Sequence, residues 1–223
     1  MSPSLLAKSY LFLYNVFQFI AWTISLWSIL WNSASTDKSA IHGGAYDSAG
    51  GLIYLIQGLA ILEVGHAAVG LVPSGVLLGL MQWGGRTHFL FAIVRRITEI
   101  HELPAICITF VAWCTSEIIR YSHYALTGIG MCPSWLTYLR YTAFIFLYPI
   151  GVGPGEMWAM YQALPFIKKE NLYSNLFNKV FFSYHSFVMV LLAIYPFLWL
   201  KLYLHLFKQR RTKLVKRNTK KEA

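Results

Sequence analysis

Two side chains suited to proton transfer, Tyr148 and Glu156, flank a glycine- and proline-rich stretch in LYPIGVGPGEMWAMY at residues 147–161. A phenol can donate its proton at neutral pH, and a carboxylate can act as a general base. In a regular helix their separation of eight positions spans about 12 Å along the axis, too far for one small substrate. Pro149, Pro154 and the neighbouring glycines therefore predict a broken helix that lines a pocket. The structural alternative is a kinked helix with a tyrosine bonded to a carboxyl.

The composition of the chain indicates a membrane protein. Of its 223 residues, 57% are hydrophobic, 17% aromatic and 13% charged, which is more apolar than a soluble domain of this size can hide. Each bilayer crossing takes about 20 apolar residues. We therefore predict an all-α, polytopic membrane helix bundle of about six transmembrane helices with a broken fifth helix, in a single transmembrane catalytic domain over residues 1–207. The predicted spans lie near residues 10–31, 50–72, 76–94, 104–122, 136–162 and 183–206.

A basic tail at residues 208–223 supplies most of the net charge of +10. Its cations are Lys208, Arg210, Arg211, Lys213, Lys216, Arg217, Lys220 and Lys221. The positive-inside bias predicts that this tail is cytosolic and lies on the surface of the membrane lipid. Six crossings place the N-terminus on the same side, so both termini are predicted to be cytosolic. We predict no nucleic-acid partner, because no folded basic face or RNA-binding motif accompanies the tail. The final Lys220-Lys221-Glu222-Ala223 resembles a dilysine retrieval signal of endoplasmic reticulum membrane proteins, or simply ends a basic tail.

Polar and ionisable side chains interrupt the predicted spans, where each costs about 3 kcal/mol or more and usually faces a cavity or a partner. Glu117 and Arg120 are three residues apart, so they can pair on one helix face. Such a pair either clamps helices together or contacts a substrate. The other polar positions besides Glu156 are Glu63, His66, Gln82, Arg86 and Arg140.

Neither a metal site nor a phosphatase site is predicted. The two closest of the seven histidines, His88 and His101, are 13 positions apart, so no local histidine pair has the spacing of a metal site. The segment HAAVGLVP at 66–73 has the outline of a phosphatase loop, H-C-x-x-G-x-x-R. However, Ala67 replaces the nucleophilic cysteine and Pro73 the phosphate-binding arginine, which excludes phosphatase chemistry at this loop.

Several motifs together carry a family resemblance that covers roughly residues 8–205. The chain resembles the very-long-chain (3R)-3-hydroxyacyl-CoA dehydratase family, also called protein tyrosine phosphatase-like, and we expect a plant-type member. The motifs are EVGHAAVGLVPS, QWGGR, WCTSEIIRYSHYA, PSWLTYLRYTAFIFLYPIG and, after Glu156, MYQALPFIKK.

This resemblance implies a six-span enzyme of the endoplasmic reticulum membrane that needs no cofactor. The family carries out the third step of fatty acid elongation, removing water from a 3-hydroxyacyl-CoA to give a trans-2-enoyl-CoA. Its essential tyrosine and glutamate correspond to Tyr148 and Glu156, which we assign as acid and base, leaving the reverse assignment open. The expected partners are the acyl-CoA substrate and the other elongation enzymes: the condensing enzyme, the ketoacyl-CoA reductase and the enoyl-CoA reductase.

One departure from the family bears on activity. The family places its glutamate seven residues after the tyrosine, whereas here the gap is eight. In a regular helix the extra residue would rotate Glu156 by about 100°. The alternative function is therefore a catalytically impaired adaptor of the elongation complex. A small transporter that uses Glu63, Glu117 and Glu156 as a relay is disfavoured, because the chain lacks repeated halves.

Charged groups in the spans are also candidates for substrate binding. Guanidinium groups suit the phosphates of CoA, and structural ion pairing is the alternative for each of them. The candidate substrate-binding residues are Arg86, Arg120, Arg140 and Glu117.

Overall fold

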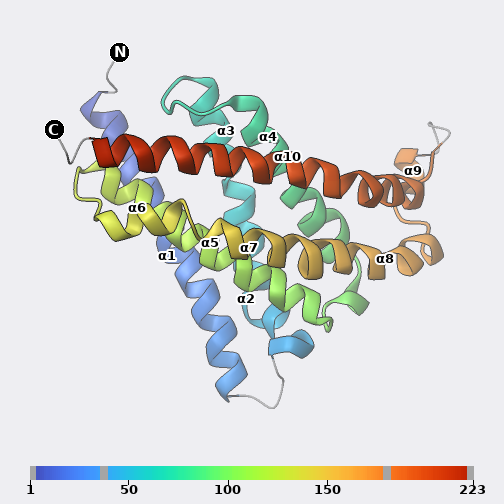
Figure 1. The fold of residues 1–223 in the computed structure, drawn as a ribbon. Coiled ribbons are helices and arrows are strands. Elements are labelled where there is room, and N and C mark those ends of the chain that lie inside the picture. The colour runs from blue at the N-terminus through green and yellow to red at the C-terminus, as the bar shows by residue number, and fades with distance from the viewer. Residues whose placement is uncertain (1–3, 36–39, 178–181, 220–223) are drawn as a thin grey trace.

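The structure is a computed structural model that describes residues 4–35, 40–177 and 182–219. Within these residues the chain is a bundle of helices without a β-strand (Figure 1). The predicted all-α fold is confirmed. Helices are the form in which an apolar segment satisfies its own backbone hydrogen bonds, as a lipid environment requires.

Each predicted span coincides with helical structure. The first is α1 (Leu5–Ser35), and the second comprises α2 (Ala45–Leu59) and α3 (Ile61–Ala68). The third is α4 (Val76–Thr87) with the π-helix η2 (His88–Val94), and the fourth is α5 (Pro104–Gly128). The fifth contains α6 (Ser134–Arg140), α7 (Phe144–Ile150), the π-helix η4 (Gly151–Met157) and α8 (Trp158–Lys169), and the sixth is α10 (Tyr184–Thr219). Short helical elements between them are η1 (Ala40–Gly44), η3 (Thr98–Ile100) and α9 (Ser174–Phe177).

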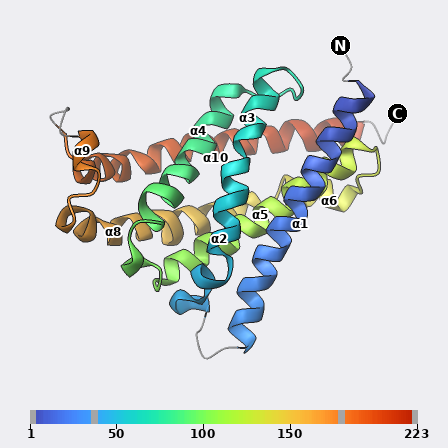
Figure 2. The same cartoon turned by 180° about the vertical axis from the view of Figure 1, so that it is seen from behind.

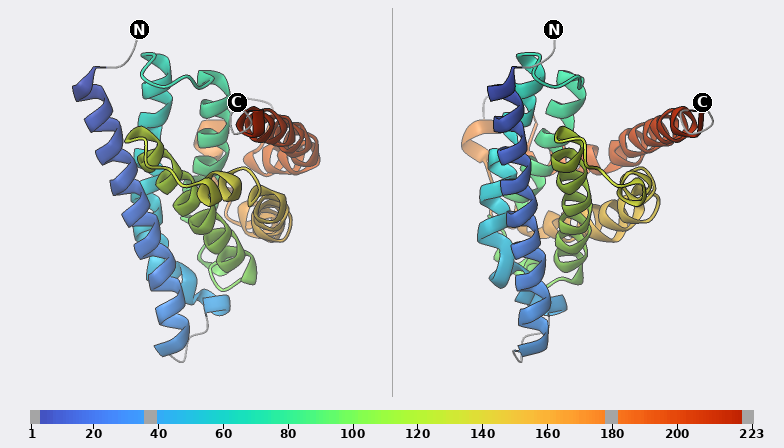
Figure 3. Two further views of the ribbon diagram at one scale, coloured as in Figure 1. Left: turned by 60° about the vertical axis from the view of Figure 1, so that its left-hand side comes forward. Right: turned by 90° about the vertical axis from the view of Figure 1, so that its left-hand side faces the viewer.

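Helix α5 is the centre of the bundle. It packs against α1 on one side and against α7 and η4 on another, and its buried residues include Phe110, Trp113 and Tyr121. Helix α10 lies along α8, and these two helices cross the direction of α1 at a steep angle (Figures 1 and 3). Helix α5 contacts α1 as well as α7, η4 and α8. Its side chains can therefore connect the two sides of the bundle.

Three helices among the described residues are long and apolar enough to cross a membrane: Leu5–Ala34, Ala45–Ala68 and Tyr184–Lys213. The chain is therefore of membrane type, and the count of six crossings stays a prediction. The start of α1 and the end of α10 lie at the same end of the molecule (Figures 2 and 3). Helix α10 continues into the predicted basic tail as far as Thr219, and the expected dilysine signal at Lys220 and Lys221 lies outside the described residues.

The fifth predicted span departs from a regular α-helix in a different way from the one we expected. The chain turns at residues 141–143 and is then helical from Phe144 to Lys169, with π-helical winding at Gly151–Met157 in place of an uncoiled break. Pro149 has no amide hydrogen for the Ile145 carbonyl one turn earlier. The Tyr203 hydroxyl donates a hydrogen bond to that carbonyl at 3.0 Å. A side chain from α10 thus replaces the missing backbone donor, and the helix continues through Pro149.

Candidate active site

Glu156 is a buried carboxylate, only 4% exposed, with a neutral hydrogen-bond donor on each oxygen. The Trp113 indole Nε1 donates to Oε1 at 2.8 Å. The Tyr195 hydroxyl donates to Oε2. These three residues come from η4, α5 and α10, so Glu156 lies where the three elements meet.

Two glycines bring the backbone of η4 close enough to α5 for this contact. A Cβ atom added to Gly155 would lie 2.6 Å from Thr109 Oγ1, and one added to Gly151 would lie 3.2 Å from the Ala112 Cβ. Thr109 cannot easily move aside, because its hydroxyl donates to the Ala105 carbonyl at 2.8 Å. The glycines that the sequence suggested as helix breakers therefore serve close helix packing, which sets Glu156 beside Trp113.

Tyr148 is half-buried on α7 and packs against α10. Its ring centre lies 6.2 Å from that of Trp199 and 6.1 Å from that of Tyr203. The phenol that hydrogen-bonds Glu156 is Tyr195, and not the Tyr148 of the kinked-helix alternative.

Arg86 connects the surroundings of Glu156 to a second polar region. Its guanidinium carbon lies 4.7 Å from the centre of the Trp113 ring, in the position of a cation–π contact. The same guanidinium donates to Oε1 of Glu117. Trp113 and Glu117 are four residues apart on α5, so one face of this helix serves both regions.

The second region, which we call the Glu117 cluster, consists of Glu63, Arg86, Glu117, Arg120 and Tyr121. Arg120 Nε donates to Glu117 Oε2 at 2.5 Å, which confirms the pairing predicted from the spacing. The Arg120 Nη1 atom also pairs with Glu63 Oε2 at 2.5 Å, and the Tyr121 hydroxyl donates to Glu63 Oε1. The cluster thus ties α3, α4 and α5 together by charge-assisted hydrogen bonds.

Arg140 lies outside this cluster. Its Nη2 atom donates a long, 3.4 Å hydrogen bond to the Tyr124 hydroxyl, and its Nε atom is buried without a partner. The guanidinium carbons of Arg120 and Arg140 lie 5.9 Å and 5.7 Å from the centre of the same Tyr124 ring. Of the four candidate substrate-binding residues, three therefore belong to the Glu117 cluster, and the fourth is separated from it by one tyrosine.

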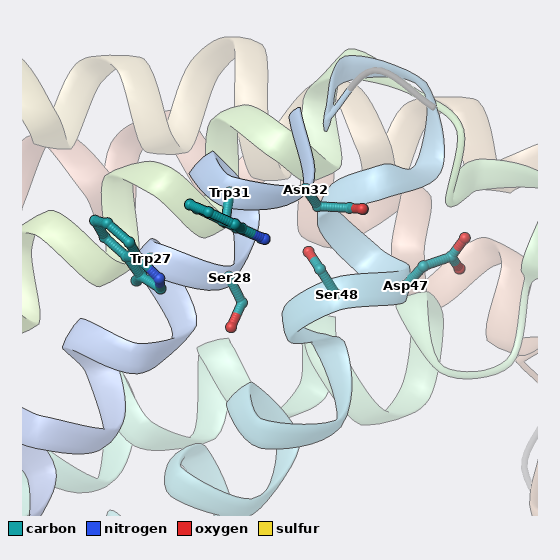
Figure 4. Close-up of a pocket in the computed structure, with 6 residues that line it drawn as sticks. All are labelled: Trp27, Ser28, Trp31, Asn32, Asp47 and Ser48. Carbon is teal, nitrogen blue, oxygen red and sulfur yellow. The ribbon is translucent and has the colours of Figure 1, made fainter. Parts of the chain in front are cut away.

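A separate open pocket of about 540 Å³ lies where α1 ends and α2 begins. Figure 4 shows the side chains that line it: Trp27, Ser28, Trp31, Asn32, Asp47 and Ser48. The Trp27 and Trp31 rings are stacked with centres 5.9 Å apart, and both are largely exposed, as is typical of tryptophans at a membrane interface. None of these residues belongs to α5, η4 or α10, so the pocket is not part of the Glu156 site.

The sequence interpretation missed the two partners of Glu156. Trp113 stands one helical turn before Glu117, so its place on the polar face of α5 was available from the spacing. Tyr195 precedes Pro196 as Tyr148 precedes Pro149, and this repeated Tyr-Pro pair within apolar runs was the available signal. Among the described residues, no group of three His, Cys, Asp or Glu side chains is placed to hold a metal ion.

Comparison with known proteins gives a consistent set of relatives. The family model described as "Protein tyrosine phosphatase-like protein, PTPLA" matches residues 57–216. The very-long-chain (3R)-3-hydroxyacyl-CoA dehydratase 2 of Mus musculus is 35% identical over 94% of this chain and 82% of its own length. The dehydratase 1 of Mus musculus is 33% identical, over 93% and 73%, and the dehydratase PASTICCINO 2 of Arabidopsis thaliana is 34% identical, over 86% of each. No solved structure matches the chain.

Proposed function

The chain belongs to the protein tyrosine phosphatase-like family, and on that premise we propose that it is a very-long-chain (3R)-3-hydroxyacyl-CoA dehydratase. The reaction removes water from a 3-hydroxyacyl-CoA and yields a trans-2-enoyl-CoA, as the third step of fatty acid elongation. The observation that carries the proposal is the Glu156 carboxylate, buried among apolar elements with neutral donors on both oxygens. No cofactor takes part.

The proposed chemistry divides two proton transfers between two side chains. The thioester acidifies the C2 hydrogen, whereas the C3 hydroxyl leaves poorly unless it is protonated. Glu156 takes the C2 proton, because a carboxylate oxygen that accepts one hydrogen bond keeps a second lone pair. Tyr148 gives its proton to the departing hydroxyl. Its place on α7, which runs directly into the π-helix that carries Glu156, supports the pairing.

The four charged candidates take different parts in this proposal. Arg86 and Arg120 have carboxylate partners, so with Glu117 they form a structural clamp that holds the face of α5 carrying Trp113. Arg140 has a neutral phenol as its hydrogen-bond partner and an unpartnered Nε atom. A guanidinium in this state suits a CoA phosphate. We assign the phosphate contact to Arg140.

An inactive adaptor of the elongation complex is the second candidate function, because of the eight-residue gap between Tyr148 and Glu156. The π-helix η4 begins at Gly151, within this gap, and continues through Glu156 to Met157. A π-helix closes its hydrogen bonds over five residues in place of four, so one of its turns takes up about one more residue than an α-turn. The extra residue is therefore absorbed without the rotation expected of a regular helix. This favours the enzyme over the adaptor.

The proposed location is the endoplasmic reticulum membrane, with both termini in the cytosol and with the condensing enzyme and the two reductases of elongation as partners. The shared end of α1 and α10 (Figure 2) and the cations Lys208, Arg210 and Arg211 near the end of α10 support this orientation. Epitopes at either terminus that antibodies reach only after the reticulum membrane is opened would contradict it. Co-purification of the three enzymes with the tagged chain tests the partners.

The function is tested with the full chain, purified in lipid nanodiscs and mixed with a 3-hydroxyacyl-CoA. We expect the wild type to form enoyl-CoA, measured by liquid chromatography, and Tyr148→Phe to be at least about 100-fold slower, as for the loss of a general acid. Tyr138→Phe, which alters an exposed tyrosine on α6, is the matched control and keeps wild-type activity.

Two results of this experiment would contradict the proposal in different ways. A wild type without enoyl-CoA product, under conditions in which a related dehydratase works, would leave the adaptor as the function. Wild-type activity in Tyr148→Phe would reject Tyr148 as the acid.

A further inference from the structure

The proposed reaction leaves the two proton-transfer residues in the wrong protonation states for a second turnover. Glu156 ends with the proton from C2, and Tyr148 ends as a phenolate, because its proton departs with the hydroxyl as water. One proton must pass from Glu156 to Tyr148 before the next substrate reacts. Glu156 is only 4% exposed, so exchange of this proton with bulk water is hindered.

Tyr195 is placed to carry this proton. Its hydroxyl is hydrogen-bonded to Glu156 Oε2, and it lies one helical turn before Trp199, whose ring packs against that of Tyr148. A phenol is both a donor and an acceptor. It can therefore take a proton on its oxygen while it releases its own.

The stripe of aromatic residues on α10 shows how Tyr195 and Tyr148 come together. Tyr195, Trp199 and Tyr203 follow one another at intervals of four residues, so they share one face of the helix. Tyr148 packs on the Trp199 and Tyr203 rings, and Trp199 and Tyr203 are stacked with centres 4.8 Å apart. Tyr195 therefore precedes the residues that bind Tyr148 by about one helical turn, or about 6 Å of rise.

We infer that Tyr195 returns the proton from Glu156 to Tyr148 after each dehydration, an inference that rests on the proposed function. In this step the Glu156 O–H bond breaks as its proton moves to the Tyr195 oxygen. The Tyr195 O–H bond breaks as its proton moves to the Tyr148 phenolate. No net charge or proton enters or leaves, and Glu156 is again a carboxylate and Tyr148 again a phenol. Tyr195 acts after bond breaking in the substrate, so it is a proton relay and not the acid or the base.

The relay has a kinetic signature that a packing role lacks. In Tyr195→Phe the ring and its packing remain, and the Trp113 indole still holds Glu156 through Oε1. The first dehydration therefore proceeds, and only the return of the proton is lost. We expect rapid mixing with excess 3-hydroxyacyl-CoA to give a burst of about one enoyl-CoA per enzyme at the wild-type rate, followed by steady-state turnover at least tenfold slower than wild type.

The matched control is Tyr184→Phe, on the same helix. It removes a buried hydroxyl that is hydrogen-bonded to His88 Nε2 at 3.0 Å, away from Glu156, and we expect wild-type rates in both phases. A Tyr195→Phe steady-state rate within twofold of this control would overturn the relay. An equal slowing of the first and later turnovers would also overturn it, since that result means Tyr195 only positions Glu156. A wild type that forms no enoyl-CoA ends the proposed function itself, which is a separate result.

Discussion

Glu117, on α5, and Glu156, packed against it, are both buried carboxylates, each 4% exposed, and their partners differ in charge. Glu117 accepts hydrogen bonds from the guanidinium groups of Arg86 and Arg120. Glu156 accepts them from an indole and a phenol. Two cations compensate the charge of Glu117 and fix its position. Neutral donors orient Glu156 without compensating its charge. The same residue type therefore suits a structural role in one region and, in the proposed reaction, proton transfer in the other.

A chain of contacts joins the two carboxylates, although their partners differ in charge. Arg86 bonds Glu117 and stacks on Trp113, which in turn bonds Glu156. The Glu117 cluster thereby fixes the donor that orients Glu156. Its function in the proposed enzyme is to hold Trp113 in place, and variants that affect one region and spare the other test this division.

The largest expected effect is on activity, in Glu156→Gln. We expect the rate of enoyl-CoA formation to fall about 1,000-fold, or about 4 kcal/mol in barrier height, because an amide cannot take the C2 proton. Stability should change little: the amide oxygen still accepts from Trp113, and the amide nitrogen donates to the Tyr195 oxygen, which can accept as well as donate. Turnover and thermal unfolding in one detergent are the measurements. More than a tenth of wild-type activity would show that Glu156 is not the base.

The next effect is on stability, in Glu117→Gln. The amide oxygen can accept from one arginine, but the amide nitrogen then faces the other guanidinium, donor against donor. Arg120 keeps Glu63, whereas the partly buried Arg86 loses its carboxylate partner. Removal of one member of a buried ion pair costs about 3 kcal/mol or more. We expect the thermal unfolding temperature to fall well below that of Glu170→Gln, which alters an exposed glutamate. An unfolding temperature equal to that of this control would show that the Glu117 cluster does not stabilise the fold.

Local spacing predicted the parts of the molecule that depend on neighbours in the chain. The six helical segments follow from apolar runs, and the Glu117–Arg120 contact follows from one helical turn of separation. Partners on other helices could not be predicted from local spacing. Packing over the whole bundle decides which faces of α5, η4 and α10 meet. Trp113 and Tyr195 therefore appear as partners of Glu156 only in three dimensions.

The winding of the fifth segment shows a second limit of sequence reasoning. Prolines and glycines predicted an uncoiled backbone, because Pro149 removes a hydrogen bond and glycine favours irregular structure. The structure supplies a replacement donor from Tyr203, 58 residues away in the chain, and takes up the extra length as a π-helix. A local rule for helix breaking fails here because a distant side chain satisfies the orphaned carbonyl.

The smallest expected effect tests how closely η4 must approach α5, in Gly155→Ala. The new Cβ would lie 2.6 Å from Thr109 Oγ1 and 3.4 Å from the Thr109 Cα, so η4 must move away from α5, which lengthens the Trp113–Glu156 hydrogen bond. We expect a loss of about 1–2 kcal/mol in stability, as for overpacking of a core, together with a lower turnover rate. Gly153→Ala is the control in the same π-helix, because its Cβ meets nothing within 4 Å. Since most of the clash is with the hydroxyl, adding Thr109→Ala to Gly155→Ala should recover part of both losses, and a double variant no better than Gly155→Ala would mean that the approach of the two backbones is not what orients Glu156.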